Sequence, residues 1–266
     1  MDIPIYVISA LRGREKNLLQ NLSAANMSYK VIPAVFFEDF PDYFNGWRSL
    51  LLSREKLTLP EIGAARAHLD VYSDLIQENH DCALILEDDA NITDLNLLVK
   101  TSLDFQRLMF EKPYLLLHYA HYAFLKKVPE IIPNVFPVIR YPSGAICYLI
   151  SRQAAIYLLE RNSNLDFVAD FAKDSRIQWY LNTSDIIRHD FSESLVHESR
   201  TKAKQSRSKR LLTLIGEISL VHFMLLMFID QNLRKNYFQS IWCPKIYQYL
   251  TLITGNRPFD SESWQK

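Results

Sequence analysis

The sequence predicts an α/β fold in which helices cover the faces of a parallel sheet. The chain opens on an apolar, β-branched run at 3–9, a helical segment, and a second apolar run at 29–36. This is the pattern of a βαβ unit. Strand-like and helix-like segments then alternate as far as residue 195. The 266 residues, 48% hydrophobic and 23% charged, suffice for one large domain with a buried core.

Local signals predict the individual elements in order. A turn at 11–14 precedes a helix whose Leu18, Leu19 and Leu22 share one side. Pro60 and Glu61 have the residue types that begin a helix. The clearest strand is 82–86, a wholly apolar run. The remaining expected elements are a helix at 95–110, a strand at 114–119, a loop containing Pro129, Pro133 and Pro137, a strand at 146–150 and a helix at 153–161.

The composition changes near residue 200, where we place the boundary between a domain of residues 1–199 and a helical C-terminal appendage of residues 200–266. Residues 200–210 contain six basic residues and no acid, and 14 of the 19 residues in 211–229 are apolar. Basic residues are attracted to anionic lipid, whereas Glu217 would be costly at the centre of a bilayer. We therefore expect a helix in the membrane interface or docked on the domain. Membrane spanning and ordinary packing in a soluble core remain alternatives.

The remaining composition indicates where the protein works. Three cysteines without a close pair fit a reducing compartment, and the apolar run at the N-terminus lacks the basic start of a signal peptide. We expect a cytoplasmic protein, peripheral to the inner face of the cytoplasmic membrane. The net charge of zero gives no indication of a nucleic-acid partner.

Three consecutive acids, Glu87, Asp88 and Asp89, follow the strand at 82–86 directly. In open α/β sheets ligands bind beyond the carboxyl ends of the strands. Adjacent carboxylates repel one another, and their oxygens suit Mg²⁺ or Mn²⁺, which also coordinate substrate phosphates. A metal site is one interpretation. The alternative is a solvated acidic turn that caps the next helix at Asn91 or Thr93.

Several motifs occur in a characteristic order: Tyr6-Val-Ile-Ser9 with Arg12 and Arg14, Glu61-Ile-Gly63 with His68, Leu84-Ile-Leu-Glu-Asp-Asp89, Tyr141-Pro-Ser-Gly144 continuing to Ala155, and Phe167-Val-Ala-Asp170. Together they resemble glycosyltransferase family 25 over about residues 3–200. That family includes bacterial lipooligosaccharide galactosyltransferases and animal collagen galactosyltransferases. The chain departs from its pattern at Ala64, Ala67 and Ala169, where the family has Cys, Ser and a Pro-Val-Asp element.

The resemblance implies a GT-A-like, Rossmann-type domain that binds a nucleotide sugar. It implies inverting, metal-dependent transfer of a hexose, with galactose from UDP-galactose preferred, to a lipooligosaccharide, lipopolysaccharide or related glycan acceptor. Mn²⁺ or Mg²⁺ would be held by Asp89 as the direct ligand and by Asp88 either as a second ligand or through water, and Glu87 would either support this site or contact the donor sugar. The general base would be Asp170. Other aspartates remain rivals for that role, namely Asp166, Asp174, Asp185 and Asp190.

The resemblance also implies donor-binding residues. Arg12 and Arg14 would meet uridine or diphosphate, and Glu61, His68 and Gly144 complete the set. His68 follows Glu61 by seven residues, so the two share a helix face, and His68 would either bind phosphate or orient a carboxylate. The alternative for each residue is structural: exposed arginines near a helix start, or a histidine satisfied within the core.

Other features receive structural interpretations. The aromatic segment 40–47 is either a wall facing the acceptor or, preferably, a plug beneath a loop, and His118 with His121 lacks a complete ligand set. A phosphoester hydrolase would need more histidines near its acids. A catalytically inactive, membrane-associated saccharide- or partner-binding protein of the same fold remains the alternative function, because of Ala64 and Ala67. From the sequence alone, Asp89→Asn is expected to relieve charge repulsion and leave thermal stability similar or higher.

Overall fold

The structure is a computed structural model that describes residues 3–39, 41, 42, 44, 46, 49, 57–109, 112–120, 122–126, 128–169, 174–189 and 258–260. In these residues a mixed sheet has the strand order β11-β6-β7-β9-β5-β8-β3-β1-β2, and β10 and β4 form a second, small sheet. The strands are β1 (Ile5–Ser9), β2 (Tyr29–Pro33), β3 (Cys82–Glu87), β4 (Ala90–Ile92), β5 (Tyr114–Leu117), β6 (Tyr122–Leu125), β7 (Val135–Ser143), β8 (Cys147–Ser151), β9 (Gln178–Asn182), β10 (Ile187–His189) and β11 (Pro258–Asp260).

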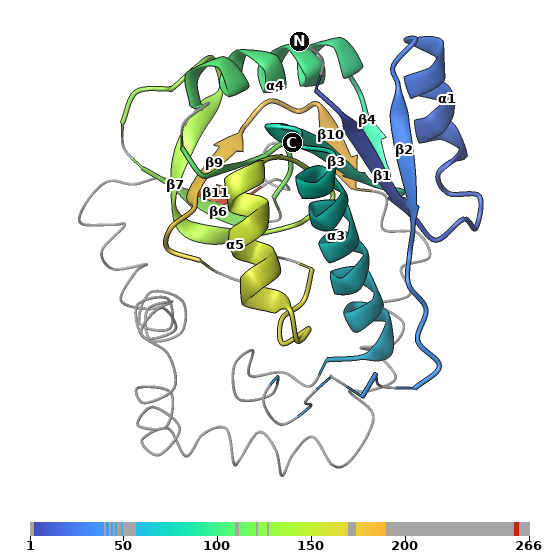
Figure 1. Cartoon of the computed structure of the whole chain (residues 1–266). Coiled ribbons are helices and arrows are strands. Elements are labelled where there is room, and N and C mark those ends of the chain that lie inside the picture. The colour runs from blue at the N-terminus through green and yellow to red at the C-terminus, as the bar shows by residue number, and fades with distance from the viewer. Residues whose placement is uncertain are drawn as a thin grey trace, which may run out of the picture.

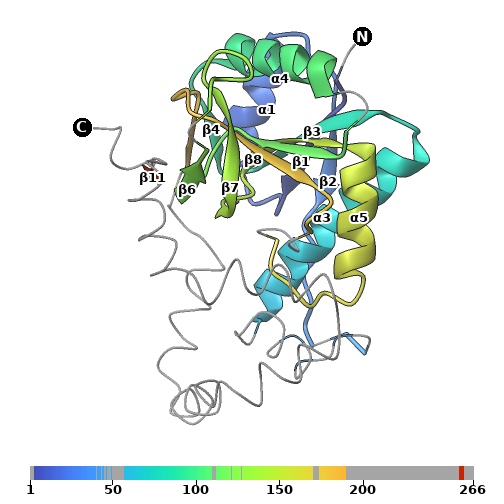
Figure 2. The ribbon, with the colours of Figure 1, turned by 90° about the vertical axis from the view of Figure 1, so that its left-hand side faces the viewer.

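Helices cover both faces of the large sheet, which gives a three-layer α/β/α arrangement (Figures 1 and 2). One face carries α1 (Lys16–Ala24) and α4 (Leu95–Met109), and the other carries α3 (Leu59–Gln77) and α5 (Arg152–Asn162), which pack against each other. Alternate residues of β1 divide between the two faces, because successive side chains of a strand point to opposite sides. Ile5 and Val7 join the α1/α4 core, whereas Tyr6 and Ile8 join the α3/α5 core.

The strand directions decide which chain ends meet. β1 pairs in parallel with β2 and with β3, and β5 pairs in parallel with β9. β8 lies antiparallel between β3 and β5. The strands β1, β3, β5 and β9 therefore all end at the same side of the sheet, which we call the carboxyl edge. The predicted α/β class is confirmed, and the sheet is mixed where the sequence led us to expect parallel strands.

The predicted helices and strands are confirmed apart from small shifts of their first and last residues. One predicted loop differs. The expected loop around Pro129, Pro133 and Pro137 was wrong at its end, because β7 begins at Val135 and includes Pro137. Proline lacks only the N–H donor, and the carbonyl of Pro137 still accepts a hydrogen bond from Lys126 N at 2.9 Å. The helix at 95 is capped by neither Asn91 nor Thr93. Asp94 Oδ1 instead accepts a hydrogen bond from Leu97 N at 2.9 Å.

The predicted appendage, residues 200–266, lies outside the described residues except for β11. Those three residues form a strand antiparallel to β6. Across the described parts of the chain, no helix has the length and apolar character needed to cross a membrane.

Helix α3 begins at the carboxyl edge with two features of the Glu61-Ile-Gly63 motif. Thr58 and Glu61 form a capping box, in which Glu61 Oε2 accepts from Thr58 N at 2.7 Å. Gly63 lies against the segment after β2, so that a Cβ added there would be 2.0 Å from the carbonyl oxygen of Val35. The glycine is therefore required by close backbone approach, and it seats the helix that carries His68.

We expect Gly63→Ala to lower the free energy of unfolding by about 1–3 kcal/mol, because the methyl group must displace backbone. Helix propensity alone predicts the opposite sign, a gain of about 1 kcal/mol. Ser73→Ala on the same helix is the control for propensity, since Ser73 only bonds back to Leu69 O. Urea unfolding of the three proteins measures the difference, and a stabilised Gly63→Ala protein would contradict the close approach.

Candidate active site

The three acids at the end of β3 lie at the carboxyl edge, beside the end of β1. Asp88 Oδ2 accepts hydrogen bonds from Ala10 N at 2.9 Å and from Ser9 Oγ at 3.3 Å. Its Oδ1 lies 3.5 Å from the Arg14 guanidinium. Burial raises the pKa of Asp88, while the hydrogen bond from Ala10 and the charge of Arg14 lower it. Asp88 thus fastens the turn after β1 to the end of β3.

The turn between β1 and α1 is organised around a second carboxylate. Glu15 Oε2 accepts hydrogen bonds from Gly13 N at 3.0 Å and Ser9 Oγ at 3.1 Å, and hydrogen bonds lower the pKa of Glu15. Leu11 and Gly13 have positive φ values of 53° and 94° in this turn. The fixed turn directs Arg14 toward the acids. Sequence reasoning missed Ser9 and Glu15, although a serine at a strand end followed by an acid six residues later was visible.

Asp89 meets two groups from distant parts of the chain. Arg14 lies 2.7 Å from its Oδ2, and His189 Nε2 lies 3.0 Å from the same oxygen. Its other oxygen, Oδ1, is buried and accepts no hydrogen bond from the described residues. His189 reaches this position because β10 pairs with β4, which places it opposite Ala90. Nothing in the sequence near the acids indicated His189.

Gly144 supports the same cluster indirectly. It has a φ of 117°, and a Cβ there would lie 3.2 Å from the ring of Tyr119. The Tyr119 ring in turn meets His189 edge-on, with centroids 5.9 Å apart. The glycine therefore makes room for an aromatic ring beside His189 at the carboxyl edge.

Glu87 contacts His68 of α3. Its Oε1 lies 3.0 Å from His68 Nε2, and His68 Nδ1 lies 2.7 Å from the Tyr148 hydroxyl. Glu87 is partly open to solvent, whereas His68 is buried. Of the two contacts expected for His68, the structure shows the one with a carboxylate.

Two predicted donor-binding residues lie elsewhere. The exposed guanidinium of Arg12 stacks on the Phe36 ring at 5.2 Å and makes no described contact with the acids. Glu61 is 4% exposed and serves the capping box of α3. The geometry thus brings together Arg14, Asp88 and Asp89 from the predicted set, with Glu87 and His68 adjacent.

Among the aspartates considered as a base, Asp170 and Asp190 lie outside the described residues. Asp174 is fully buried and forms a bidentate ion pair with Arg176. It precedes β9, so it lies at the opposite edge of the sheet from the acids. Asp185 is paired with Arg188, whose hydrogen bond lowers the pKa of Asp185. Asp166 is 1% exposed, so access to it is restricted.

His118 has the structural role expected for it, and His121 lies outside the described residues. His118 Nδ1 accepts from Asn182 Nδ2 at 3.2 Å, and its Nε2 lies 2.9 Å from Ser102 Oγ. Burial lowers the pKa of His118 to about 3, which keeps it neutral. Three of the four aromatic residues in 40–47 also lie outside the described residues, and the fourth, Phe44, packs on the core.

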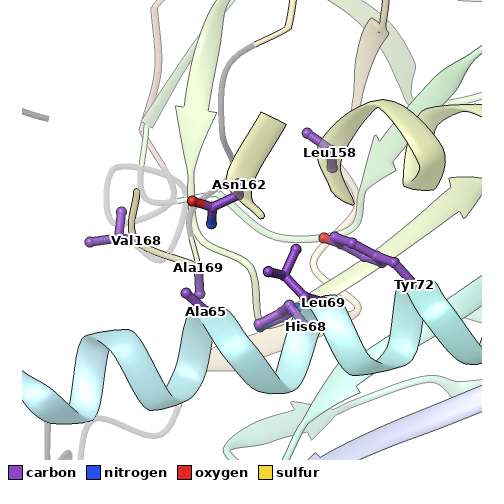
Figure 3. Close-up of a pocket in the computed structure, with 8 residues that line it drawn as sticks. All are labelled: Ala65, His68, Leu69, Tyr72, Leu158, Asn162, Val168 and Ala169. Atoms are coloured by element: carbon purple, nitrogen blue, oxygen red, sulfur yellow. The ribbon is translucent and has the colours of Figure 1, made fainter. Parts of the chain in front are cut away.

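Figure 3 shows a small pocket between α3, α5 and the segment after α5. Its volume is about 10 Å³, about the space of one water molecule and far below the usual range for ligand pockets of about 300–1,000 Å³. The polar groups of His68, Tyr72 and Asn162 that line it are bonded within the protein. Ala169, which precedes Asp170 in sequence, lines the pocket with His68. The pocket is a packing gap beside the acids rather than a donor site.

No group of three or more histidine, cysteine or acidic side chains in the described ranges is arranged to hold a metal ion. Among the residues that the structure describes, Arg14 places its positive charge beside Asp88 and Asp89, and His189 adds a nitrogen at Asp89.

The site combines the positive charge of Arg14 with acids at the carboxyl edge of an α/β sheet, the edge at which ligands bind in open sheets. Residues 2–177 match the family model of glycosyltransferase family 25, described as an LPS biosynthesis protein. The match covers most of the chain and spans Arg14, Glu87, Asp88 and Asp89. This chain belongs to glycosyltransferase family 25 and is a glycosyltransferase.

Solved structures are similar at low identity. A mannose-1-phosphate geranyltransferase from Thermus thermophilus has a TM-score of 0.41 at 11% identity, over 71% of this chain and 76% of that one. The protein A197 from STIV has a TM-score of 0.37 at 12% identity, over 71% and 86%. A glycosyltransferase involved in glycosylating the major capsid of PBCV-1 has a TM-score of 0.31 at 10% identity, over 58% and 63%. No curated protein sequence matches the chain.

The contact between Arg14 and Asp89 reverses the sign of the stability change expected from sequence. Asp89→Asn now removes the nearest partner of Arg14, so we expect lower stability, not similar or higher. A double-mutant cycle with Arg14→Met should give a coupling of about 0.5–3 kcal/mol in urea unfolding with chelator present. The exposed pair Arg107 and Asp104 is the control, for which about 0.5 kcal/mol or less is expected. Equal coupling in both pairs would contradict a specific role for Arg14.

Proposed function

We propose that this glycosyltransferase transfers a hexose, galactose from UDP-galactose, with inversion, to a lipooligosaccharide, lipopolysaccharide or related surface glycan. The family's description as an LPS biosynthesis protein supports this acceptor class. The observation that carries the proposal is the cluster of Arg14, Asp88, Asp89 and His189 at the carboxyl edge. A diphosphate bound there meets a guanidinium, which suits phosphate geometry.

One oxygen of Asp89 supports the proposal of a divalent cation at this residue. Its Oδ1 is a buried carboxylate oxygen that accepts no hydrogen bond from the described residues, and such hard oxygens suit Mn²⁺ or Mg²⁺. Asp88 Oδ2 already accepts two hydrogen bonds from the turn after β1. Asp88 therefore holds this turn in place and adds negative charge next to the ion. The cation supplies positive charge that stabilises the departing diphosphate.

The other steps of the reaction are assigned to side chains of the protein. Arg14 neutralises the acids and faces the diphosphate, and Arg12 with its Phe36 partner lies on the exposed turn beside it. Glu87 contacts the donor sugar and Gly144 takes part in donor binding, as the resemblance implies. Asp170 takes the proton of the acceptor hydroxyl. The position of Ala169 next to His68 supports Asp170 as the base.

The inactive binding protein gains no support from the structure. It rested on Ala64 and Ala67, of which Ala67 is fully buried in the α3/α5 core. At that position alanine in place of serine changes packing and removes no group from the carboxyl edge. Slow hydrolysis of a UDP-sugar without acceptor separates the two functions, since an inactive binder releases no nucleotide.

The metal-dependent donor chemistry is tested with purified protein, Mn²⁺ and a panel of UDP-sugars, with nucleotide release read by mass spectrometry. We expect turnover with UDP-galactose that chelator removes and Mn²⁺ restores. Asp89→Asn should abolish transfer, because it removes the direct ligand. Asp104→Asn on the exposed face of α4 is the matched control and should retain activity. Full activity in excess chelator would disprove the metal's role.

Asp170→Asn tests the base. Loss of a general base lowers turnover by about 10²–10⁴-fold. Binding of UDP-galactose, measured by calorimetry, should barely change, because the base meets the acceptor rather than the donor. If the variant keeps wild-type turnover, another residue is the general base, and Asp190 is the next residue to substitute.

We also propose that residues 200–229 hold the enzyme on the inner face of the cytoplasmic membrane. Six basic residues precede a largely apolar stretch there, and each contributes about 1 kcal/mol near anionic lipid. Flotation with anionic vesicles compares the full chain with a chain ending at Glu198. We expect salt-sensitive flotation of the full chain alone. Equal flotation of both chains, or of neither, would exclude this segment as the anchor.

A further inference from the structure

A chain of hydrogen bonds runs inward from Glu87 into the core between the sheet and α3. Glu87 Oε1 lies 3.0 Å from His68 Nε2, His68 Nδ1 lies 2.7 Å from the Tyr148 hydroxyl, and Tyr148 lies 2.9 Å from the Tyr72 hydroxyl. The outer end is partly open, since the Glu87 side chain is 28% exposed. The inner end is closed, since Tyr72 is 2% exposed.

The acceptor at the outer end determines where the protons lie. An ionised carboxylate only accepts hydrogen bonds, so His68 Nε2 carries a proton and donates the hydrogen bond to Glu87. In the neutral imidazole, Nδ1 is then an acceptor and the Tyr148 hydroxyl donates to it. In the charged imidazole, Nδ1 donates to Tyr148, which donates onward to Tyr72. His68 therefore donates to Glu87 in both protonation states.

Tyr148 fixes the imidazole in this orientation. It lies on β8, opposite Ile85 of β3, and it is fully buried. Its ring stacks on His68 with centroids 5.8 Å apart and an interplanar angle of 24°. Burial raises the pKa of Tyr148 well above that of a free phenol, so the hydroxyl keeps its proton. Two contacts, one polar and one ring-to-ring, thus hold His68 from its inner side.

We propose that Tyr148 is a positioning residue, which through His68 holds the Glu87 carboxylate in the orientation that meets the donor sugar. The inference rests on the proposed role of Glu87. The series of hydrogen bonds ends within the core at Tyr72. This favours a role in orienting Glu87 over a role in carrying protons to solvent. The hydrogen bonds described above join Tyr148 to His68 and to Tyr72, so we expect removal of its hydroxyl to act on turnover through His68.

Tyr148→Phe deletes the hydroxyl and keeps the ring. We expect kcat with UDP-galactose to fall about 10–100-fold, as for other groups that orient a functional side chain. KM for the donor should change about twofold or less, because Arg14 and the acids are untouched. Tyr114→Phe is the matched control: Tyr114 is also buried, on β5, and its hydroxyl bonds Cys82 in the opposite core. It should retain wild-type kcat with a similar fall in Tm.

A spectroscopic measurement separates orientation from general destabilisation. The ¹⁵N shift of His68 Nδ1 should move in Tyr148→Phe, where this atom loses its hydrogen bond, and stay unchanged in Tyr114→Phe, while Nε2 keeps its proton in all three proteins. His68→Gln and His68→Leu provide a second test that does not require Tyr148→Phe to fold. The glutamine amide can donate to Glu87 and leucine cannot, so the glutamine variant should retain more kcat.

The outcomes distinguish this inference from the proposed function. If the wild-type protein turns over no UDP-sugar, the proposed function is wrong, and the inference that rests on it is wrong as well. If the wild-type protein is active, the positioning role alone is overturned by wild-type kcat in Tyr148→Phe, by an equal loss in Tyr114→Phe, or by unchanged ¹⁵N shifts. Equal kcat of His68→Gln and His68→Leu also overturns it.

Discussion

Two adjacent carboxylates, Asp88 and Asp89, are largely withdrawn from water at the end of β3, and the surrounding structure depends on compensating them. Burying charge is costly unless it is paired and hydrogen-bonded. The compensation comes from the backbone after β1, from Arg14, and from His189 at the end of β10. The left-handed residues of the β1–α1 turn and the return of β10 to β4 both follow from this requirement. Glu87, the third acid, contacts His68 of α3.

Most of the fold was predictable because its signals are local. The capping residues and apolar runs that begin α3 and β3 lie within a few positions of one another, and both elements were expected. The antiparallel direction of β8 has no local signal, since it is decided by pairing with β3 across some 60 residues of chain. The strand through Pro137 was missed because proline normally indicates a loop, and its carbonyl side can still pair.

The site was predictable in its acids and not in their partners. Glu87, Asp88 and Asp89 are consecutive and follow an apolar strand, so position alone drew attention to them. His189 and Tyr119 are brought there by sheet pairing and ring packing, which leave no trace near the acids. Glu61 was assigned to the donor from its motif, whereas its carboxylate closes a capping box. Gly63 and Gly144 lie against groups that leave little room for a side chain, and these neighbours are known only from the three-dimensional structure.

The separation of Asp89 from His189 by 100 residues has a consequence for synthesis of the protein on the ribosome. When β1, β2 and β3 have emerged, the acids are already fixed at the end of a strand, but β10 is still to be made. At about 5–20 residues per second, the gap lasts on the order of 5–20 seconds. During that interval Arg14 is the one described cation beside the pair. The nascent chain thus carries its own counter-charge within its first 14 residues, before the last partner arrives.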